Sequence, residues 1–298
     1  MVSQSGQLCV LCGTRLASRK GEHVWPLWYL RGEDRKGPGA FAWTHNGAPI
    51  CDRAGSPIIA GQVRRRLKLP VCTVCNGLLE QRFESPTKDV LRRLFSLEGN
   101  VSLTSGDAGR VGEWFAKTLM LSAHPEAYYD HSAITATAIR LDVDELPPTG
   151  FYEWLTSSGL PPDGLSVWLH RTDPAAPGRS LYTVPLPRLT ADAATVDFVE
   201  FSVALHGLCV TMVVHPGWPV EHPLEASGQA VRVLPAPSAA VDLGPLSVLG
   251  YRTVSWLRCY VALKPGVLGA ISLPPLRASE EVFAYLPEVG DLVDEWSA

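Results

Sequence analysis

Apolar residues recur with a helical period through one central stretch of the chain. From Val74 to about residue 123 they return every three or four positions, which is typical of helices that bury one face. The pattern predicts a first helix that Pro86 ends, a second with Ser85 as its N-cap, and a third over residues 107–123. The expected buried residues are Leu78, Leu79 and Phe83 in the first helix, Val90, Leu91, Leu94 and Phe95 in the second, and Val111, Trp114, Phe115, Thr118 and Leu119 in the third.

On both sides of this helical stretch the pattern favours short strands. Residues 31–69 are rich in Gly, Pro and charge, and within them AFAWTHNGAPI places Asn46-Gly47 between two apolar runs, which predicts a β-hairpin. Beyond His124-Pro125, runs such as GLSVWLHRT, VDFVEFSVAL and LCVTMVV alternate with Pro and Gly clusters. This texture predicts an antiparallel sheet with a few helices, so the expected fold class is α+β.

The composition is that of a globular protein. With 298 residues, 46% of them hydrophobic and 19% charged, the chain has enough apolar material for one large domain or two ordinary ones. The most apolar window, FSVALHGLCVTMVV, contains a histidine and falls short of the roughly 18 apolar residues of a membrane helix. The first residues lack a basic region followed by an apolar one. We therefore expect a cytoplasmic protein without membrane contact.

Charge is distributed unevenly along the chain. Residues 1–99 contain 15 Lys and Arg against 8 Asp and Glu, whereas the remainder contains 11 against 22, which together give the net charge of −4. A basic first third indicates contact with a polyanion, and nucleic acid, most of all DNA, is the expected partner. The acidic remainder is a candidate surface for a protein partner. A difference in composition between two domains is the alternative explanation.

The cysteines carry the strongest chemical signal. Seven cysteines do not form a closed disulfide framework, and four of them form two Cys-x-x-Cys pairs, Cys9/Cys12 and Cys72/Cys75. Each pair presents two thiolates from one tight turn, and two pairs complete a tetrahedral zinc shell. A thioredoxin-like redox motif would need a βαβ setting, which the pattern does not show. We expect structural Zn²⁺ on these four cysteines, and buried free thiols at Cys51, Cys209 and Cys259.

Three motifs follow one another in a specific order. Cys9 to Gly13 reads Cys-x-x-Cys-Gly, residues 22–26 read Glu-His-Val-Trp-Pro, and Cys72 to Asn76 reads Cys-x-x-Cys-Asn, with Leu79 and Glu84 further along the predicted helix. Over about residues 9–85 this combination resembles the HNH (ββα-metal, treble-clef) endonuclease superfamily, in its bacterial Glu-His-x-x-Pro form. The resemblance implies a treble-clef zinc module that hydrolyses DNA phosphodiester bonds with the help of a metal ion.

The resemblance also implies roles for individual residues. His23 would be the general base that takes a proton from water, and Glu22 and Asn76 would hold one catalytic divalent cation, Mg²⁺ or Mn²⁺. Taken by itself, a histidine beside Trp25 and Trp28 is more often a core residue. The stretch RRRLKLPVC contains no counterpart of the family's middle asparagine, and glutamate replaces the more common aspartate at position 22.

Basic residues lie immediately before the second cysteine pair. Arg64, Arg65, Arg66 and Lys68 are expected to contact nucleic-acid phosphates, contacts that carry no base information. A solvated basic face is the alternative. The remaining histidines lack ligand spacing and are expected to be structural or surface residues.

The expected organisation is an N-terminal zinc and nuclease module with a following helix over residues 1–98, then an α+β domain of unknown role over residues 99–298. The first functional hypothesis is an HNH endonuclease, and restriction or defence against foreign DNA follows only by family analogy. The second is a non-catalytic zinc module that binds nucleic acid, with a C-terminal interaction domain. The third is a small-molecule enzyme seated in the C-terminal region, for which the sequence selects no site.

Overall fold

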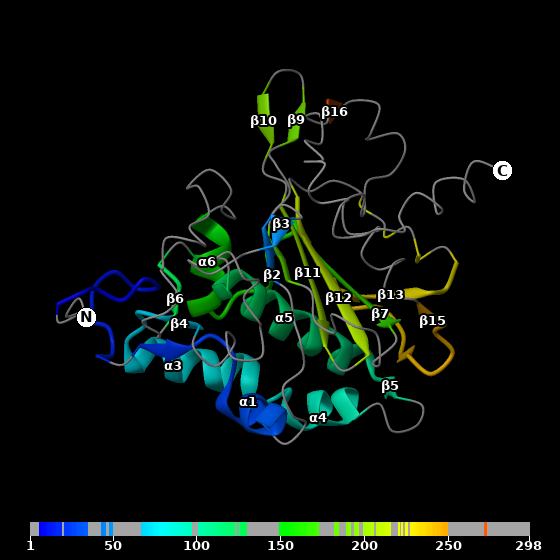
Figure 1. The fold of residues 1–298 in the computed structure, drawn as a ribbon, viewed down its shortest axis with the longest axis horizontal. Coiled ribbons are helices and arrows are strands. Elements are labelled where there is room, and N and C mark those ends of the chain that lie inside the picture. Colours follow the sequence, from blue (N-terminus) through cyan, green and yellow to red (C-terminus); the bar gives the residue numbers. More distant parts are fainter. Residues whose placement is uncertain are drawn as a thin grey trace.

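A computed structural model gives the fold (Figure 1). It describes residues 6–19, 21–34, 43–45, 48–49, 67–96, 101–122, 124, 126–129, 149–172, 182–184, 189–191, 194–196, 199–205, 207–215, 220, 222, 224–225, 227–249 and 271–272. The structural statements below concern these residues. They form a mixed α+β fold in which small sheets accompany one large sheet, in agreement with the predicted class.

The large sheet comprises eight strands among the described residues. Its spatial order is β13 (Ala230–Leu234), β7 (Leu165–Thr172), β12 (Leu208–Val214), β11 (Val199–Leu205), β8 (Tyr182–Val184), β2 (Trp43–His45) and β3 (Ala48–Pro49), and β15 (Val248–Leu249) pairs with β7. Most pairs are antiparallel, but β2 with β8 and β15 with β7 are parallel. The predicted hairpin is confirmed, because β2 pairs antiparallel with β3. Its attachment to the large sheet through β8 was not predicted.

Smaller sheets account for the remaining described strands. One has the order β1 (Glu22–His23), β4 (Leu67–Leu69) and β6 (Tyr128–Tyr129); another has β10 (Ala194–Val196), β9 (Leu189–Ala191) and β16 (Ile271–Ser272); a third pairs β14 (Val241–Asp242) with β5 (Ser102–Leu103). The first of these sheets positions the candidate site.

The helices lie beside the large sheet in Figure 1. They are α1 (Leu27–Asp34), α3 (Thr73–Leu79), which continues as the π-helical turn η1 (Glu80–Glu84), α4 (Lys88–Ser96), α5 (Ser105–Ser122) and α6 (Thr149–Thr156). Helix α5 contacts β13, β7 and β12 on one side and η1 and α4 on another, so it lies between the large sheet and the helices that follow the second cysteine pair.

Helix α5 occupies the region in which the periodicity predicts a helix over residues 107–123. The five residues expected to be buried there, Val111, Trp114, Phe115, Thr118 and Leu119, are all buried. Two glycines let the helix approach the sheet closely. A Cβ on Gly112 would lie 2.8 Å from the Cβ of Leu234, and one on Gly109 would lie 2.9 Å from that of Ala236.

One detail of the first predicted helix is wrong. Leu79 and Phe83 are buried, but Leu78 is exposed. A π-turn has more residues per turn than an α-helix. The buried residues of α3 and η1 are therefore four positions apart, namely Cys75, Leu79 and Phe83, and Leu78 lies outside this buried row. The second helix buries Val90, Leu91, Leu94 and Phe95 as predicted, although it begins at Lys88.

The helix that starts at the second cysteine pair is held at its far end. Arg82 in η1 donates hydrogen bonds to the carbonyl oxygens of Trp154 and Gly159, both at 2.6 Å, and also to the carbonyl of Ser157. These carbonyls lie at the end of α6, where a cation stabilises the helix dipole. The helix bearing Cys72 and Cys75 is therefore fastened to an element of the C-terminal two thirds of the chain.

Candidate metal centre

The first cysteine pair lies in a small hairpin. Leu8 and Leu16 form an antiparallel bridge, and the backbone N–H of Cys9 donates to the carbonyl of Arg15 at 2.8 Å. Gly13 closes the turn with its N–H on the carbonyl of Cys9 at 2.8 Å, and its φ of +62° is a conformation that glycine adopts without strain. The spacing Cys-x-x-Cys-Gly thus forms a tight turn that presents both sulfurs on one side.

The second pair lies at the start of helix α3. Cys72 is the N-cap, and its sulfur accepts a hydrogen bond from the N–H of Cys75 at 3.4 Å. Two backbone bonds join this segment to the first hairpin: Val10 N–H to the Pro70 carbonyl at 3.1 Å, and Ser18 N–H to the Val71 carbonyl at 3.0 Å. These bonds bring together two pairs that are 60 residues apart in the sequence.

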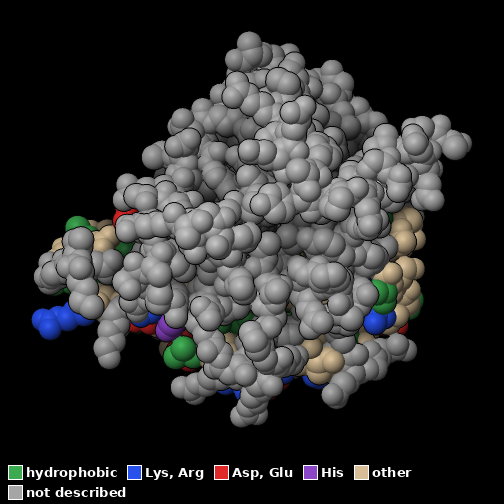
Figure 2. Space-filling view, viewed as in Figure 1, with side chains coloured by type: hydrophobic (Ala, Val, Ile, Leu, Met, Phe, Trp, Pro, Cys, Tyr) green, Lys and Arg blue, Asp and Glu red, His purple; other side chains and the backbone are tan. Residues whose placement is uncertain are grey.

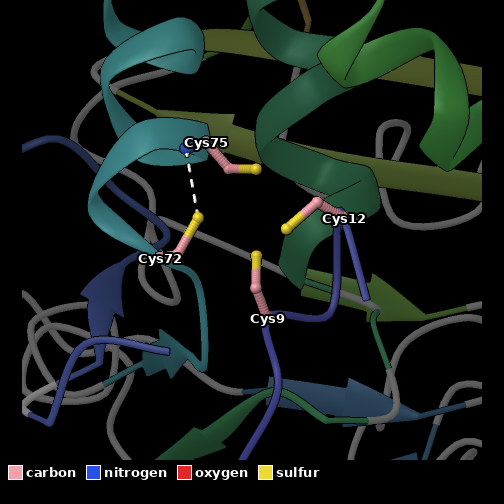
Figure 3. A group of neighbouring side chains, drawn as sticks. All are labelled: Cys9, Cys12, Cys72 and Cys75. Atoms are coloured by element: carbon pink, nitrogen blue, oxygen red, sulfur yellow. Dashed lines mark hydrogen bonds between the residues drawn. The ribbon is translucent and has the colours of Figure 1, made fainter. Parts of the chain in front are cut away.

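The four cysteine sulfurs converge on one point. All lie within 4.8 Å of one another, and Figure 3 shows two pointing inward from the N-terminal hairpin and two from α3. In a tetrahedral zinc–sulfur shell, with Zn–S bonds of about 2.3 Å, the sulfurs are separated by about 3.8 Å. The sulfur-only donor set and this spacing therefore fit a zinc ion, and the prediction that the two pairs come together in one cluster able to hold a metal ion is confirmed.

The protonation chemistry of the cluster agrees with a cation site. Hydrogen bonds from Thr14, and from the backbone of Thr14 and Arg15, lower the pKa of the Cys12 thiol to about 5. Burial, together with the neighbouring sulfurs of Cys72 and Cys9, raises the pKa of Cys75. Sulfurs this close repel one another as thiolates, and a divalent cation removes that repulsion.

Glu22 and His23 form strand β1, beside the segment that leads to Cys72. β1 pairs antiparallel with β4, with Glu22 opposite Leu69 and His23 opposite Lys68. Residues directly opposite one another in such a pair share a face, and neighbours along a strand point to opposite faces. His23 therefore shares a face with Lys68, and Glu22 shares the face of the buried Leu69.

The environment of Glu22 follows from this placement. Burial raises the pKa of its carboxyl, while a hydrogen bond from the Ser18 side chain and the charge of Lys68 act in the opposite direction. Ser18 reaches Glu22 because the chain turns at Gly21, whose N–H donates to the Ser18 carbonyl at 3.0 Å and whose φ is +61°. Sequence reasoning missed Ser18, since nothing in its local pattern marks a contact four residues on.

Asn76 directly follows Cys75, the last cysteine of the cluster. It lies in α3, is partly buried, and its backbone N–H donates to the Cys72 carbonyl at 3.0 Å. One cluster of sulfurs thus fixes the segment that carries Asn76, and through the pairing of β4 with β1 it also holds the strand of Glu22 and His23.

Aromatic residues anchor the chain just after His23. Trp25 is fully buried, with its ring centre 5.3 Å from that of Tyr29 and 6.0 Å from that of Trp114 on α5. Tyr29 in turn contacts Phe95 on α4, at 5.3 Å between ring centres. Within GEHVWPLWYL, Trp25 and Tyr29 belong to the core. His23 is only partly buried and lies at the border of that core.

Of the predicted phosphate contacts, the structure describes Lys68 but not Arg64, Arg65 or Arg66, which lie outside the described residues. In the view of Figure 2, the visible described side chains lie along the left, lower and right margins, where basic, acidic and apolar groups are mixed. Cys209 is buried and forms no disulfide bond within the described residues, as predicted, and Cys51 and Cys259 lie outside the described residues. Among the described helices, none has the length and apolar character of a membrane span.

Comparisons of the chain with protein-family models, with curated proteins and with solved structures found no match. The function must therefore be argued from the residues themselves.

Proposed function

We propose that this protein is a metal-dependent endonuclease of the HNH type, which hydrolyses DNA phosphodiester bonds. The observation that carries the proposal is the arrangement around the four cysteines. A hairpin with Cys9 and Cys12, the β1–β4 strand pair, and a helix start with Cys72 and Cys75 follow one another around one cluster. This succession supports a treble-clef module, and Glu22, His23 and Asn76 occupy the positions of the motifs that resemble the HNH superfamily.

In this proposal His23 is the general base. A neutral imidazole accepts a proton from the attacking water, whose oxygen forms the new bond to phosphorus as the bond to the leaving 3′ oxygen breaks. The partial exposure of His23 leaves it accessible to water and substrate. The buried rings of Trp25 and Tyr29, two and six positions further along the chain, anchor the segment that follows His23.

Glu22 and Asn76 are the proposed ligands of one divalent cation, Mg²⁺ or Mn²⁺. Oxygen donors suit such hard cations, as sulfur suits zinc, so the two kinds of site take different metals. When bound, the cation neutralises charge on the phosphate and on the leaving oxygen. Ser18, which donates to the carboxyl of Glu22, would orient it for this role.

The chain lacks the middle asparagine that related motifs use to constrain the histidine loop. Other contacts supply a comparable constraint here. The Val24 N–H donates to the Leu67 carbonyl at 3.1 Å, which extends the pairing of β1 with β4 past His23. Together with the aromatic anchors, this bond supports a fixed position for the proposed base.

Substrate contacts are assigned by charge. Arg64, Arg65, Arg66 and Lys68 would hold DNA phosphates, and the acidic remainder of the chain would target or regulate the nuclease through a protein partner. A role in restriction or defence against foreign DNA belongs to the same proposal.

The proposal is tested with supercoiled plasmid DNA. Purified protein is incubated with the plasmid and Mg²⁺ or Mn²⁺, and binding to a labelled duplex is measured in parallel without divalent cation. Nicking or linearisation that chelation abolishes supports the nuclease. Binding without any cutting would instead support a non-catalytic zinc module that binds nucleic acid.

A further inference from the structure

We propose that Lys68 is a catalytic residue of this site, whose ammonium contacts a non-bridging oxygen of the phosphodiester that is cut. This inference rests on the proposed nuclease function and deepens it. By charge alone Lys68 belongs with the arginines before the second cysteine pair, as one of several contacts to flanking phosphates. Its place in the fold separates it from them.

Lys68 stands directly beside the proposed base. The register of β1 and β4 sets His23 opposite Lys68, so both side chains leave the sheet on the same face, with Cβ atoms about 5 Å apart. A phosphate that offers its phosphorus to a water held by His23 places its own oxygens within the reach of a lysine at that position.

The strand fixes Lys68 in this position. β4 is the central strand of its sheet, with β1 on one side and β6 on the other, and Tyr128 occupies the register position across from Lys68 on β6. Leu67 and Leu69 are both 1% exposed, so the face opposite Lys68 is buried. The backbone of Lys68 therefore cannot move away from that of His23 without unpairing the strand.

Lys68 brings a cationic donor to the face that carries the proposed base. Its positive charge also acts on Glu22, the proposed cation ligand, so Lys68 lies close to both functional residues of β1. A phosphodiester bound on the face that Lys68 shares with His23 would meet the ammonium on its non-bridging oxygens. Negative charge on these oxygens grows in the transition state, and a positioned cationic donor is most effective where charge develops.

The test compares cleavage rate with affinity. Lys68→Met keeps the aliphatic stem and removes the charge, Lys68→Arg keeps the charge, and Arg93→Gln removes one charge from an exposed position on α4. Single-turnover cutting of a labelled duplex is measured at saturating protein, and the Kd for the same duplex is measured without divalent cation. Zinc content and circular dichroism verify the fold, and Lys68→Gln is the second variant if Lys68→Met does not fold.

The expected result is a loss of about 100-fold or more in the single-turnover rate of Lys68→Met, with Kd changed less than about threefold. Lys68→Arg should retain more of the rate than Lys68→Met, and Arg93→Gln should cut like wild type. A normal rate with a weakened Kd would overturn the inference and leave the nuclease assignment intact. A wild-type protein that cuts under no condition would overturn both.

Discussion

Lys117 on α5 donates a hydrogen bond to Glu84 in η1 at 3.0 Å, and the lysine side chain is 1% exposed. Its ammonium also lies 5.7 Å from the centre of the Trp114 ring. A buried charge depends on such a partner, because removing the partner leaves the charge uncompensated away from bulk water. The ion pair therefore joins the helical segment that begins at Cys72 and Cys75 to the helix that supports the large sheet.

Removing one partner of this pair should be costly. Glu84→Gln leaves the ammonium of Lys117 buried without a countercharge, and we expect a loss of about 3 kcal/mol in the free energy of unfolding. Lys117→Met in the same background should recover much of that loss. Urea unfolding of both single variants and the double variant measures the coupling. Single variants that each cost less than about 0.5 kcal/mol would show that the pair contributes little.

The close contact between α5 and the large sheet predicts that a larger residue at Gly112 destabilises the protein. Gly112→Ala places a methyl group 2.8 Å from the Cβ of Leu234 and 3.0 Å from the carbonyl oxygen of Val233, so helix and strand must separate. We expect a destabilisation of about 1–3 kcal/mol. Gly106→Ala is the control on the same helix, since its Cβ would meet no atom within 4 Å. If both variants unfold at the same urea concentration, the close approach of helix and strand does not contribute to the free energy of unfolding.

Zinc should be stoichiometric and necessary for the fold of the N-terminal module. Metal analysis of the purified protein is expected to give one zinc per chain, and Cys75→Ser to remove most of it and lower the melting temperature. Cys209→Ser, a buried thiol on β12 outside the cluster, should keep its zinc. Zinc that persists at full occupancy in Cys75→Ser would remove this cysteine from the shell.

Two buried histidines on the large sheet and its flank predict a pH effect on stability. Burial lowers the pKa of His170 to about 3 and that of His222 to about 4, and their ring centres lie 5.3 Å apart. The unfolded chain takes up these protons near pH 6.5, and the folded protein does so only well below that. Their contribution to stability is thus complete above about pH 6.5 and is lost as the pH falls toward 4.

The slope of this loss is about 1.4 kcal/mol per pH unit for each histidine within that window. Chemical unfolding of wild type and His170→Gln at pH 7, 6 and 5 measures it. The variant should be less stable at pH 7 but should lose less stability between pH 7 and 5. Parallel pH profiles for the two proteins would contradict the buried, neutral state of His170.

Local patterns predicted the elements that depend on local interactions. The helix expected over residues 107–123 is α5, because its apolar period runs uninterrupted through five buried positions. The same period misplaced Leu78, since no pattern announces the π-turn that follows it. From its charge, Lys117 would be predicted to be exposed to solvent. Its burial depends on the ion pair with Glu84, which lies 33 positions earlier in the chain.

The candidate site likewise has one part that local sequence spacing predicts and one part that depends on long-range pairing. The two Cys-x-x-Cys spacings were sufficient to predict the cluster of four cysteines, because each turn has few geometries that present both sulfurs. The position of Lys68 beside His23 depends instead on the register between β1 and β4, which are separated by more than 40 residues. Long-range register leaves no mark in a short stretch of sequence, so this neighbour of the proposed base emerged only from the fold.

The most direct test of the proposed nuclease divides the roles of its three site residues. DNA cutting is measured against Mn²⁺ concentration for wild type, His23→Ala, Glu22→Gln and Asn76→Ala, with His124→Ala as a control histidine outside the site. We predict that His23→Ala loses at least about 100-fold in rate even at saturating Mn²⁺. Glu22→Gln and Asn76→Ala should instead need more Mn²⁺ for half-maximal cutting, and His124→Ala should behave like wild type. Cutting by His23→Ala at the wild-type rate would contradict the assignment of the base and, with it, the proposed mechanism.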